Sequence, residues 1–327
     1  MAKLLRAPTQ QIRTPVSDSG RWERFEPRDG DIIIGTFSKC GTTWAQRIVD
    51  LLVFQSADIR PFAQISPWLD STIFNALDDD LATLNAQTHR RYIKSHLPFD
   101  ALPVWDTVKY IHVGRDGRDA RLSWQNHEQG FTPQILARIG VQAMALARER
   151  GQIAGGPPVP TPDDPRLYLL RWFDELEAGL DAPSQPGSTR PGYFGFEASY
   201  WRERKRPNLL LVHYNDLKEN LADEMRRLSA FLDIETPESL MPSLVEAARF
   251  ETMKKDGDAL LPGLNEAFDR GADRFLNKGQ SGRWREVLND ADVARYESIA
   301  RRAATPGLAR WLRGGRKLAG DPRSSPD

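Results

Sequence analysis

The chain has 327 residues, and its 45 lysine and arginine residues balance 45 aspartate and glutamate residues, so its formal net charge is zero. That balance excludes the broad basic field that attracts nucleic acid, and any anion site must be local. A single cysteine, Cys40, excludes an internal disulfide framework and fits a cytoplasmic location. No apolar run is long enough to cross a membrane, so we expect no membrane partner.

Short apolar runs that suit buried parallel strands recur along the chain, and helical patterns follow most of them. Strands that alternate with helices predict an α/β fold, here a P-loop-like central parallel sheet flanked by helices. The expected strands cover residues 31–36, 91–94, 108–113 and 208–213, and the helices that follow cover 42–54, 117–127 and 216–232.

We expect one α/β domain over residues 21–313, between flexible tails at residues 1–20 and 314–327. Residues 129–195 interrupt the alternating pattern with segments rich in glycine and proline, so we interpret them as an insertion. We interpret the insertion as a lid or a wall for an acceptor, with a passive surface excursion as the alternative. Its helical patterns cover residues 133–150 and 167–180.

A loop containing Lys39, Gly41, Thr42 and Thr43 separates the first expected strand from its helix. The N-terminus of a helix directs unpaired N–H groups forward, so this loop predicts an anion site, and phosphate suits it best. The loop is not a standard P-loop, because Lys39 precedes Gly41, whereas the standard lysine follows the second glycine.

Polar side chains also follow the next two expected strands, at the sheet edge where open α/β folds bind ligands. His96 comes after the second strand, two residues beyond Lys94, and its imidazole can take a proton at neutral pH. Arg115 follows the third strand, where a metal-using phosphotransferase would favour a carboxylate, and a guanidinium binds phosphate as a planar fork. Ser123 lies about two helical turns further on. The other histidines are expected to be structural or surface residues: His89, His112, His127 and His213.

These segments resemble the sulfotransferases that use 3′-phosphoadenosine 5′-phosphosulfate (PAPS). The residues F-S-K-C-G-T-T-W around Lys39 resemble the family's phosphosulfate loop, Y-P-K-S-G-T-T-W. The residues K-S-H-L-P around His96 resemble K-T-H-L-P, and the block from Arg115 to Ser123 resembles R-N-x-x-D-x-x-x-S. The segment F-L-N-K-G-Q-S-G-R-W resembles F-x-R-K-G-x-x-G-D-W, with Asn277 in place of the family's arginine; Arg274 or Lys278 could supply the missing charge.

The resemblance implies sulfuryl transfer from PAPS to a hydroxyl, or an amine, of a small-molecule acceptor, with no metal. It implies that His96 is the general base, that Lys39 stabilises the departing bridge oxygen, and that Lys94 steadies the sulfuryl or 5′-phosphate oxygens. Trp44 and Phe250 would face each other across the purine. The full set implied to bind the nucleotide is Lys39, Cys40, Gly41, Thr42, Thr43, Trp44, Arg115, Ser123, Tyr214, Phe250, Lys278 and Gly279.

Two other classes remain open. A P-loop nucleotide kinase or NTPase is disfavoured by the position of Lys39 and by Arg115, and a non-catalytic nucleotide-binding module is disfavoured by His96 and Lys94. The identity of the acceptor and the oligomeric state are also open. Aromatic residues could line an acceptor pocket or belong to the core: Phe62, Trp68 and Phe74.

Overall fold

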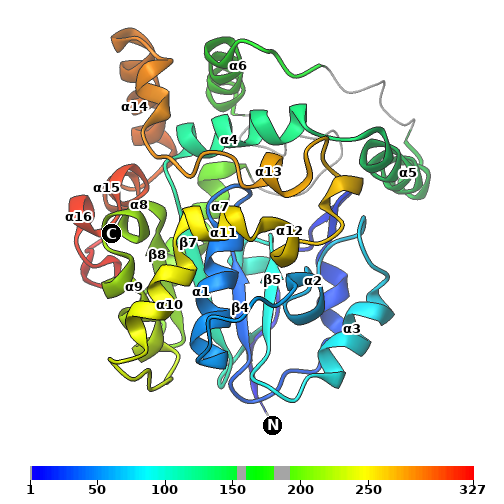
Figure 1. Cartoon of the computed structure of the whole chain (residues 1–327). Helices are drawn as coiled ribbons and strands as arrows, with labels where there is room; N and C mark the ends of the chain where they lie inside the picture. The colour runs from blue at the N-terminus through cyan, green and yellow to red at the C-terminus, as the bar shows by residue number, and fades with distance from the viewer. Residues whose placement is uncertain (1, 153–159, 180–191) are drawn as a thin grey trace.

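The computed structural model describes residues 2–152, 160–179 and 192–327. Within them a four-stranded, fully parallel sheet forms the centre, in the order β5-β4-β7-β8 (Figure 1). This confirms the α/β fold class and the four expected strands. Their bounds are β4 (Ile32–Gly35), β5 (Tyr92–Ser95), β7 (Lys109–Gly114) and β8 (Leu209–His213).

The strand order opens a crevice at one edge of the sheet. β5 lies on one side of β4 and β7 on the other, so the connections after β4 and β5 lead to opposite sides. In open α/β folds the ligand binds outside the carboxyl ends of the strands at such a switch point. Gly35 pairs with both Ser95 and His112, so β4 and β5 end at one level, and β7 runs on beside β8 to Gly114.

Helices cover both faces of the sheet, which explains why its strands are almost continuously apolar. Alternate residues of β4 point to opposite faces: Ile33 packs into one core cluster, and Ile32 and Ile34 pack into the other. The second cluster includes α1 (Thr42–Phe54), which follows β4 as expected. Above the carboxyl edge, in the view of Figure 1, lie α4 (Gly117–Gln129), α11 (Phe250–Lys255), α12 (Gly257–Leu260) and α13 (Gly271–Phe275).

The insertion contains α5 (Pro133–Glu149) and α6 (Pro165–Glu177), close to the two helices expected there; its residues 153–159 and 180–191 lie outside the described residues. The expected helix over 216–232 is wrong, because it divides into α8 (Tyr214–Glu219) and α9 (Leu221–Phe231). Asn220 separates them and caps α9 by accepting a hydrogen bond from the Asp223 N–H.

The remaining elements are short strands and peripheral helices. The strands are β1 (Leu4–Arg6), β2 (Arg13–Thr14), β3 (Ser17–Asp18) and β6 (Val104–Trp105). The helices are α2 (Phe62–Ile65), α3 (Leu77–Ala86), α7 (Tyr193–Arg202), α10 (Met241–Ala248), α14 (Asp290–Ala303), α15 (Pro306–Gly314) and α16 (Arg316–Ala319). Among the described residues, none of the helices has the length and apolar character needed to cross a membrane.

Both ends of the chain, predicted as flexible tails, instead pack against the domain. At the N-terminal end β1 pairs with β6, and the Arg6 guanidinium donates to the Phe99 carbonyl at 2.6 Å. At the C-terminal end the buried Arg204 guanidinium donates to the carbonyls of Pro322 and Ser325. Composition did not reveal this packing, because both ends are polar and make many of the contacts through backbone groups.

Candidate functional site

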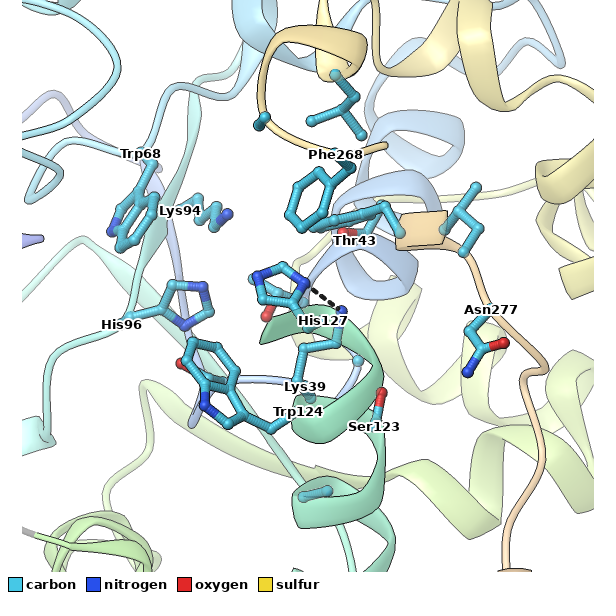
Figure 2. A pocket seen from close by; sticks show the side chains of 18 of the residues that line it. Lys39, Thr43, Trp68, Lys94, His96, Ser123, Trp124, His127, Phe268 and Asn277 are labelled. Carbon is cyan, nitrogen blue, oxygen red and sulfur yellow. Dashed lines mark hydrogen bonds between the residues drawn. The ribbon is translucent and has the colours of Figure 1, made fainter. Parts of the chain in front are cut away.

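A cavity of about 690 Å³ lies at the carboxyl edge of the sheet. Except for Cys40, every site residue predicted from the sequence lines it. Figure 2 shows the layout: Ser123 and Asn277 lie on one side, His96 and Trp68 lie on the other, and Lys39 and His127 lie between them. The loops after four strands therefore converge on one space, as expected from the parallel sheet.

The loop between β4 and α1 depends on two residues with left-handed backbone. Lys39 has φ 66° and Gly41 has φ 108°. A Cβ at Gly41 would come within 3.1 Å of the Tyr214 ring, so glycine is required both for its conformation and for space. Thr42 begins α1, whose first N–H groups face the cavity end of the loop.

Cys40 is the predicted site residue that does not line the cavity. Its side chain is fully buried outside the cavity, and its amide donates to the Phe37 carbonyl at 3.3 Å. That hydrogen bond closes a tight turn over four residues, which engages the amide within the loop. The nucleotide-binding role implied for Cys40 through its amide stays a prediction.

Arg115 holds the loop against a distant segment of the chain. Its guanidinium donates to the Lys39 carbonyl at 2.9 Å and to the Gln280 carbonyl at 2.8 Å, and it lies 4.2 Å from the centre of the Tyr214 ring. The carboxylate of Asp119, which the sequence did not single out as a site residue, accepts from the N–H groups of Gly282 and Arg283. The two side chains together fix residues 277–283 beside the loop.

Those residues form the far wall of the cavity. Gly279 has φ 59° and lies so close to Phe250 that a Cβ would meet the ring at 2.6 Å. The Trp44 indole donates to the Ala248 carbonyl at 2.8 Å, and its ring meets Tyr214 edge-on. Lys278 lines the cavity.

Of the two residues that could compensate for Asn277, the structure brings only Lys278 to the cavity. Arg274 does not line it. Its guanidinium is held by the Asp269 carboxylate at 2.6 Å and by the Asn126 side chain at 3.2 Å.

Hydrogen bonds and packing hold the His96 ring in an orientation that suits a general base. Its Nδ1 lies 2.8 Å from the Thr36 carbonyl oxygen, which can only accept, so Nδ1 carries a proton and Nε2 carries the lone pair of the neutral imidazole. Asp70, which the sequence did not predict, accepts from the His96 backbone N–H at 3.2 Å and from the Trp68 indole at 2.8 Å. The Trp68 ring packs edge-on against the imidazole with 4.9 Å between centroids.

Two lysines reach into the same space, where each is partly exposed to the cavity. Burial, aided by the charges of Arg115 and Lys94, lowers the pKa of Lys39 to about 7. Burial likewise lowers the pKa of Lys94 to about 8, although the Asp70 carboxylate opposes the shift. Such depressed pKa values are typical of sites that hold an anion or perform chemistry.

His127, expected to be a structural or surface residue, instead lines the cavity. Its Nδ1 lies 3.2 Å from the Lys39 ammonium group (Figure 2). Burial, and then the charges of Lys39, Lys94 and His96, hold its pKa well below the usual value. The sequence did carry a signal for this position. His127 lies four residues after Ser123, and residues four apart share one face of a helix, so both side chains are expected to face the same site.

An apolar region adjoins His96 and His127. The Trp68 and Phe74 side chains line it, so they belong to the pocket. Phe62 also reaches the cavity lining but is almost wholly buried in the core. The insertion contributes Ile135 and Ile139 from α5. Further apolar lining comes from Ile73, Trp124, Phe131, Leu264, Phe268 and Phe275.

Comparisons with known proteins identify the family. A sulfotransferase domain is recognised over residues 29–307. The chain is 34% identical to a glycolipid sulfotransferase of Mycobacterium bovis, over 93% of this chain and 94% of that protein. It is 27% identical to mouse sulfotransferase 1 family member D1, over 85% and 83% of the two chains. The chain belongs to the sulfotransferase family and is an enzyme of sulfuryl transfer, which decides against a nucleotide kinase and a non-catalytic module.

Solved structures show the same fold. A mouse sulfotransferase complexed with PAP matches with a TM-score of 0.64 at 17% identity, over 95% of this chain and 98% of that one. Retinol dehydratase in complex with androsterone and the inactive cofactor PAP matches with a TM-score of 0.63 at 20% identity, over 88% and 84% of the chains.

Proposed function

We propose that this enzyme transfers the sulfuryl group of PAPS to a hydroxyl of an amphiphilic small molecule, with His96 as the general base. One observation carries the proposal: a single cavity joins a cationic half, suited to a nucleotide, to an apolar half, and they meet at Lys39, Lys94 and His96. Sulfuryl transfer needs the donor and the acceptor in one water-poor space, with a base between them.

The cationic half fits a nucleotide with several phosphate oxygens. Lys39 and Lys94 have depressed pKa values, so a bound anion would favour their charged forms. The Nε of Arg115 is buried and has no hydrogen-bond partner among the residues that the structure describes. Ser123 and Lys278 line the same half. Each of these groups can donate to a phosphate oxygen.

When bound, PAPS supplies an activated sulfuryl group on a good leaving group. His96 takes the proton of the acceptor hydroxyl at Nε2, while its Nδ1–H stays on the Thr36 carbonyl. Lys39 donates to the oxygen that bridges sulfur and phosphorus and so stabilises the charge that develops there. Lys94 would donate to the sulfuryl or 5′-phosphate oxygens of the bound donor and so help to position it.

The apolar half favours an acceptor with a substantial hydrocarbon part. Aromatic and aliphatic side chains line it from Trp68 to Phe275, and α5 adds two isoleucines at its outer wall. Burial of apolar surface would hold such a molecule with its hydroxyl at His96. The mycobacterial relative is named a glycolipid sulfotransferase, which supports an amphiphilic acceptor for this enzyme.

Nucleotide binding tests the cationic half directly. We expect adenosine 3′,5′-bisphosphate to bind in EDTA roughly 10–100-fold more tightly than AMP, because each charge-assisted hydrogen bond to the 3′-phosphate contributes about 1.5–3 kcal/mol. Isothermal titration calorimetry measures both affinities. Ser123→Ala should reduce the difference in affinity between the two nucleotides. Ser243→Ala, at an exposed helix position, should leave that difference unchanged. Equal affinities for the two nucleotides would remove the 3′-phosphate site.

A further inference from the structure

His127 is a polar group in an otherwise aromatic part of the cavity wall. Its ring lies 4.9 Å from that of Trp124, 5.1 Å from that of Phe131, 4.5 Å from that of Phe268 and 5.6 Å from that of Phe275, measured between centroids. A fifth aromatic ring would fill this position and bury more apolar surface. An imidazole here therefore needs an explanation beyond packing.

The contact with Lys39 determines which nitrogen of His127 carries the proton. A bound anionic nucleotide favours the ammonium form of Lys39, which has three donors and no acceptor. The His127 Nδ1, at 3.2 Å from it, must then accept. A neutral imidazole has one donor and one acceptor, and its low pKa keeps His127 neutral, so Nε2 carries the hydrogen.

That Nε2–H points into the space where the acceptor must sit. Figure 2 shows the ring of His127 between Lys39 on one side and His96 and Lys94 on the other, with the nitrogen opposite the Lys39 contact directed toward His96 and Lys94. The reacting hydroxyl itself needs its lone pair for attack on sulfur and gives its proton to His96. A donor to that oxygen would oppose the attack. In the proposed mechanism Lys94 already donates to the sulfuryl or 5′-phosphate oxygens, so the partner left for Nε2–H is a second oxygen of the acceptor, close to the reacting one.

We propose that His127 is a specificity-determining residue whose Nε2–H donates to an oxygen adjacent to the reacting hydroxyl, so that the site selects vicinal diols, as in a sugar headgroup, over simple alcohols. The inference rests on the proposed function and narrows its acceptor class. A simple alcohol would leave the Nε2–H unpaired against aromatic rings, a loss that discriminates by roughly 10–100-fold.

The test compares an alkyl glucoside with the alkanol of the same chain length, by kcat/KM for sulfuryl transfer from PAPS. Wild-type enzyme should prefer the glucoside, and His127→Phe should reduce the preference roughly tenfold or more. Any effect that acts through Lys39 changes kcat/KM for both acceptors alike, so it cancels in the ratio of the two values. His127→Gln, whose amide can donate from the Nε2 position, should retain most of the preference, and His89→Phe, at a histidine that packs on Phe54 away from the cavity, should leave it unchanged.

Three outcomes would overturn the inference. The wild-type enzyme could prefer the alkanol, or His127→Phe could leave the ratio of the two kcat/KM values unchanged. His127→Phe and His127→Gln could also lose the preference for the glucoside equally, which would make the shape of the ring the determinant. Unaltered affinity for adenosine 3′,5′-bisphosphate shows that each variant is folded. An enzyme that binds this nucleotide but transfers sulfate to neither acceptor contradicts the proposed acceptor class together with the inference. An enzyme that does not bind it contradicts the proposed function itself.

Discussion

Replacing His96 by asparagine is expected to lower kcat by roughly 10²–10⁴-fold, the usual contribution of a general base. Asparagine can still donate to the Thr36 carbonyl, which lies 2.8 Å from Nδ1 in the wild-type protein, but it has no basic nitrogen to replace Nε2. The affinity for adenosine 3′,5′-bisphosphate should be nearly unchanged, because His96 lies across the cavity from Ser123 and Asn277, on the side that we propose for the acceptor (Figure 2).

Single-turnover rates and calorimetry measure these two quantities separately. His89→Asn provides a matched control, since His89 does not line the cavity and its substitution should leave both quantities unaltered. Near-normal turnover of His96→Asn would show that the Thr36 contact makes His96 a structural residue and that another group removes the proton.

Replacing Lys39 by methionine is expected to lower kcat by roughly 10²–10³-fold, as for removal of one donor that stabilises a developing negative charge. Methionine keeps most of the length of the side chain and can pack on Phe275, but it loses the cation–π contact of the Lys39 ammonium, which lies 4.4 Å from the centre of that ring. The charge is therefore the main property that changes. Lys205→Met, at an exposed position outside the cavity, should retain full turnover.

The depressed pKa of Lys39 predicts a pH dependence of nucleotide binding. With a pKa of about 7 in the ligand-free protein, against 10.5 ordinarily, Lys39 is largely neutral at about pH 8, and an anionic ligand raises its pKa again. Binding should therefore take up a proton, and affinity should fall as pH rises above about 7. Calorimetry in two buffers of different ionisation enthalpy measures the uptake, which should be smaller in Lys39→Met and unchanged in Lys205→Met.

In contrast to nucleotide affinity, the stability of the ligand-free protein should increase as pH rises. Because the folded pKa of Lys39 lies below its unfolded value, the folded state binds fewer protons between about pH 7 and 10.5, and this group makes the fold more stable as pH rises through that range. Lys39→Met should consequently raise the Tm of the ligand-free protein near pH 7 by a few degrees, since about 1 kcal/mol corresponds to roughly 2–4 °C in larger domains. An unaltered Tm together with unaltered proton uptake would mean that Lys39 titrates normally.

The sheet and the cationic half of the cavity were predictable because their signals are local. Four apolar runs gave the strands, and the residues after them, such as Lys39 and Arg115, converge because parallel strands end at one edge. Less local features escaped prediction. Asp70 holds His96 from a loop 26 residues away in sequence, and Asn220 breaks a helix with a side-chain hydrogen bond. The apolar wall draws on α5 and on residues beyond 260, so only the folded chain brings it together.

The most direct test of the account measures transfer of radiolabelled sulfate from PAPS to an amphiphilic alcohol by the wild-type enzyme and by His96→Asn, in the presence of EDTA. We expect transfer to the acceptor hydroxyl by the wild-type protein and a loss of roughly 10²–10⁴-fold in the variant, with the affinity for adenosine 3′,5′-bisphosphate retained. Equal transfer by the two proteins, or no transfer by a wild-type protein that binds the nucleotide, would contradict the central claim.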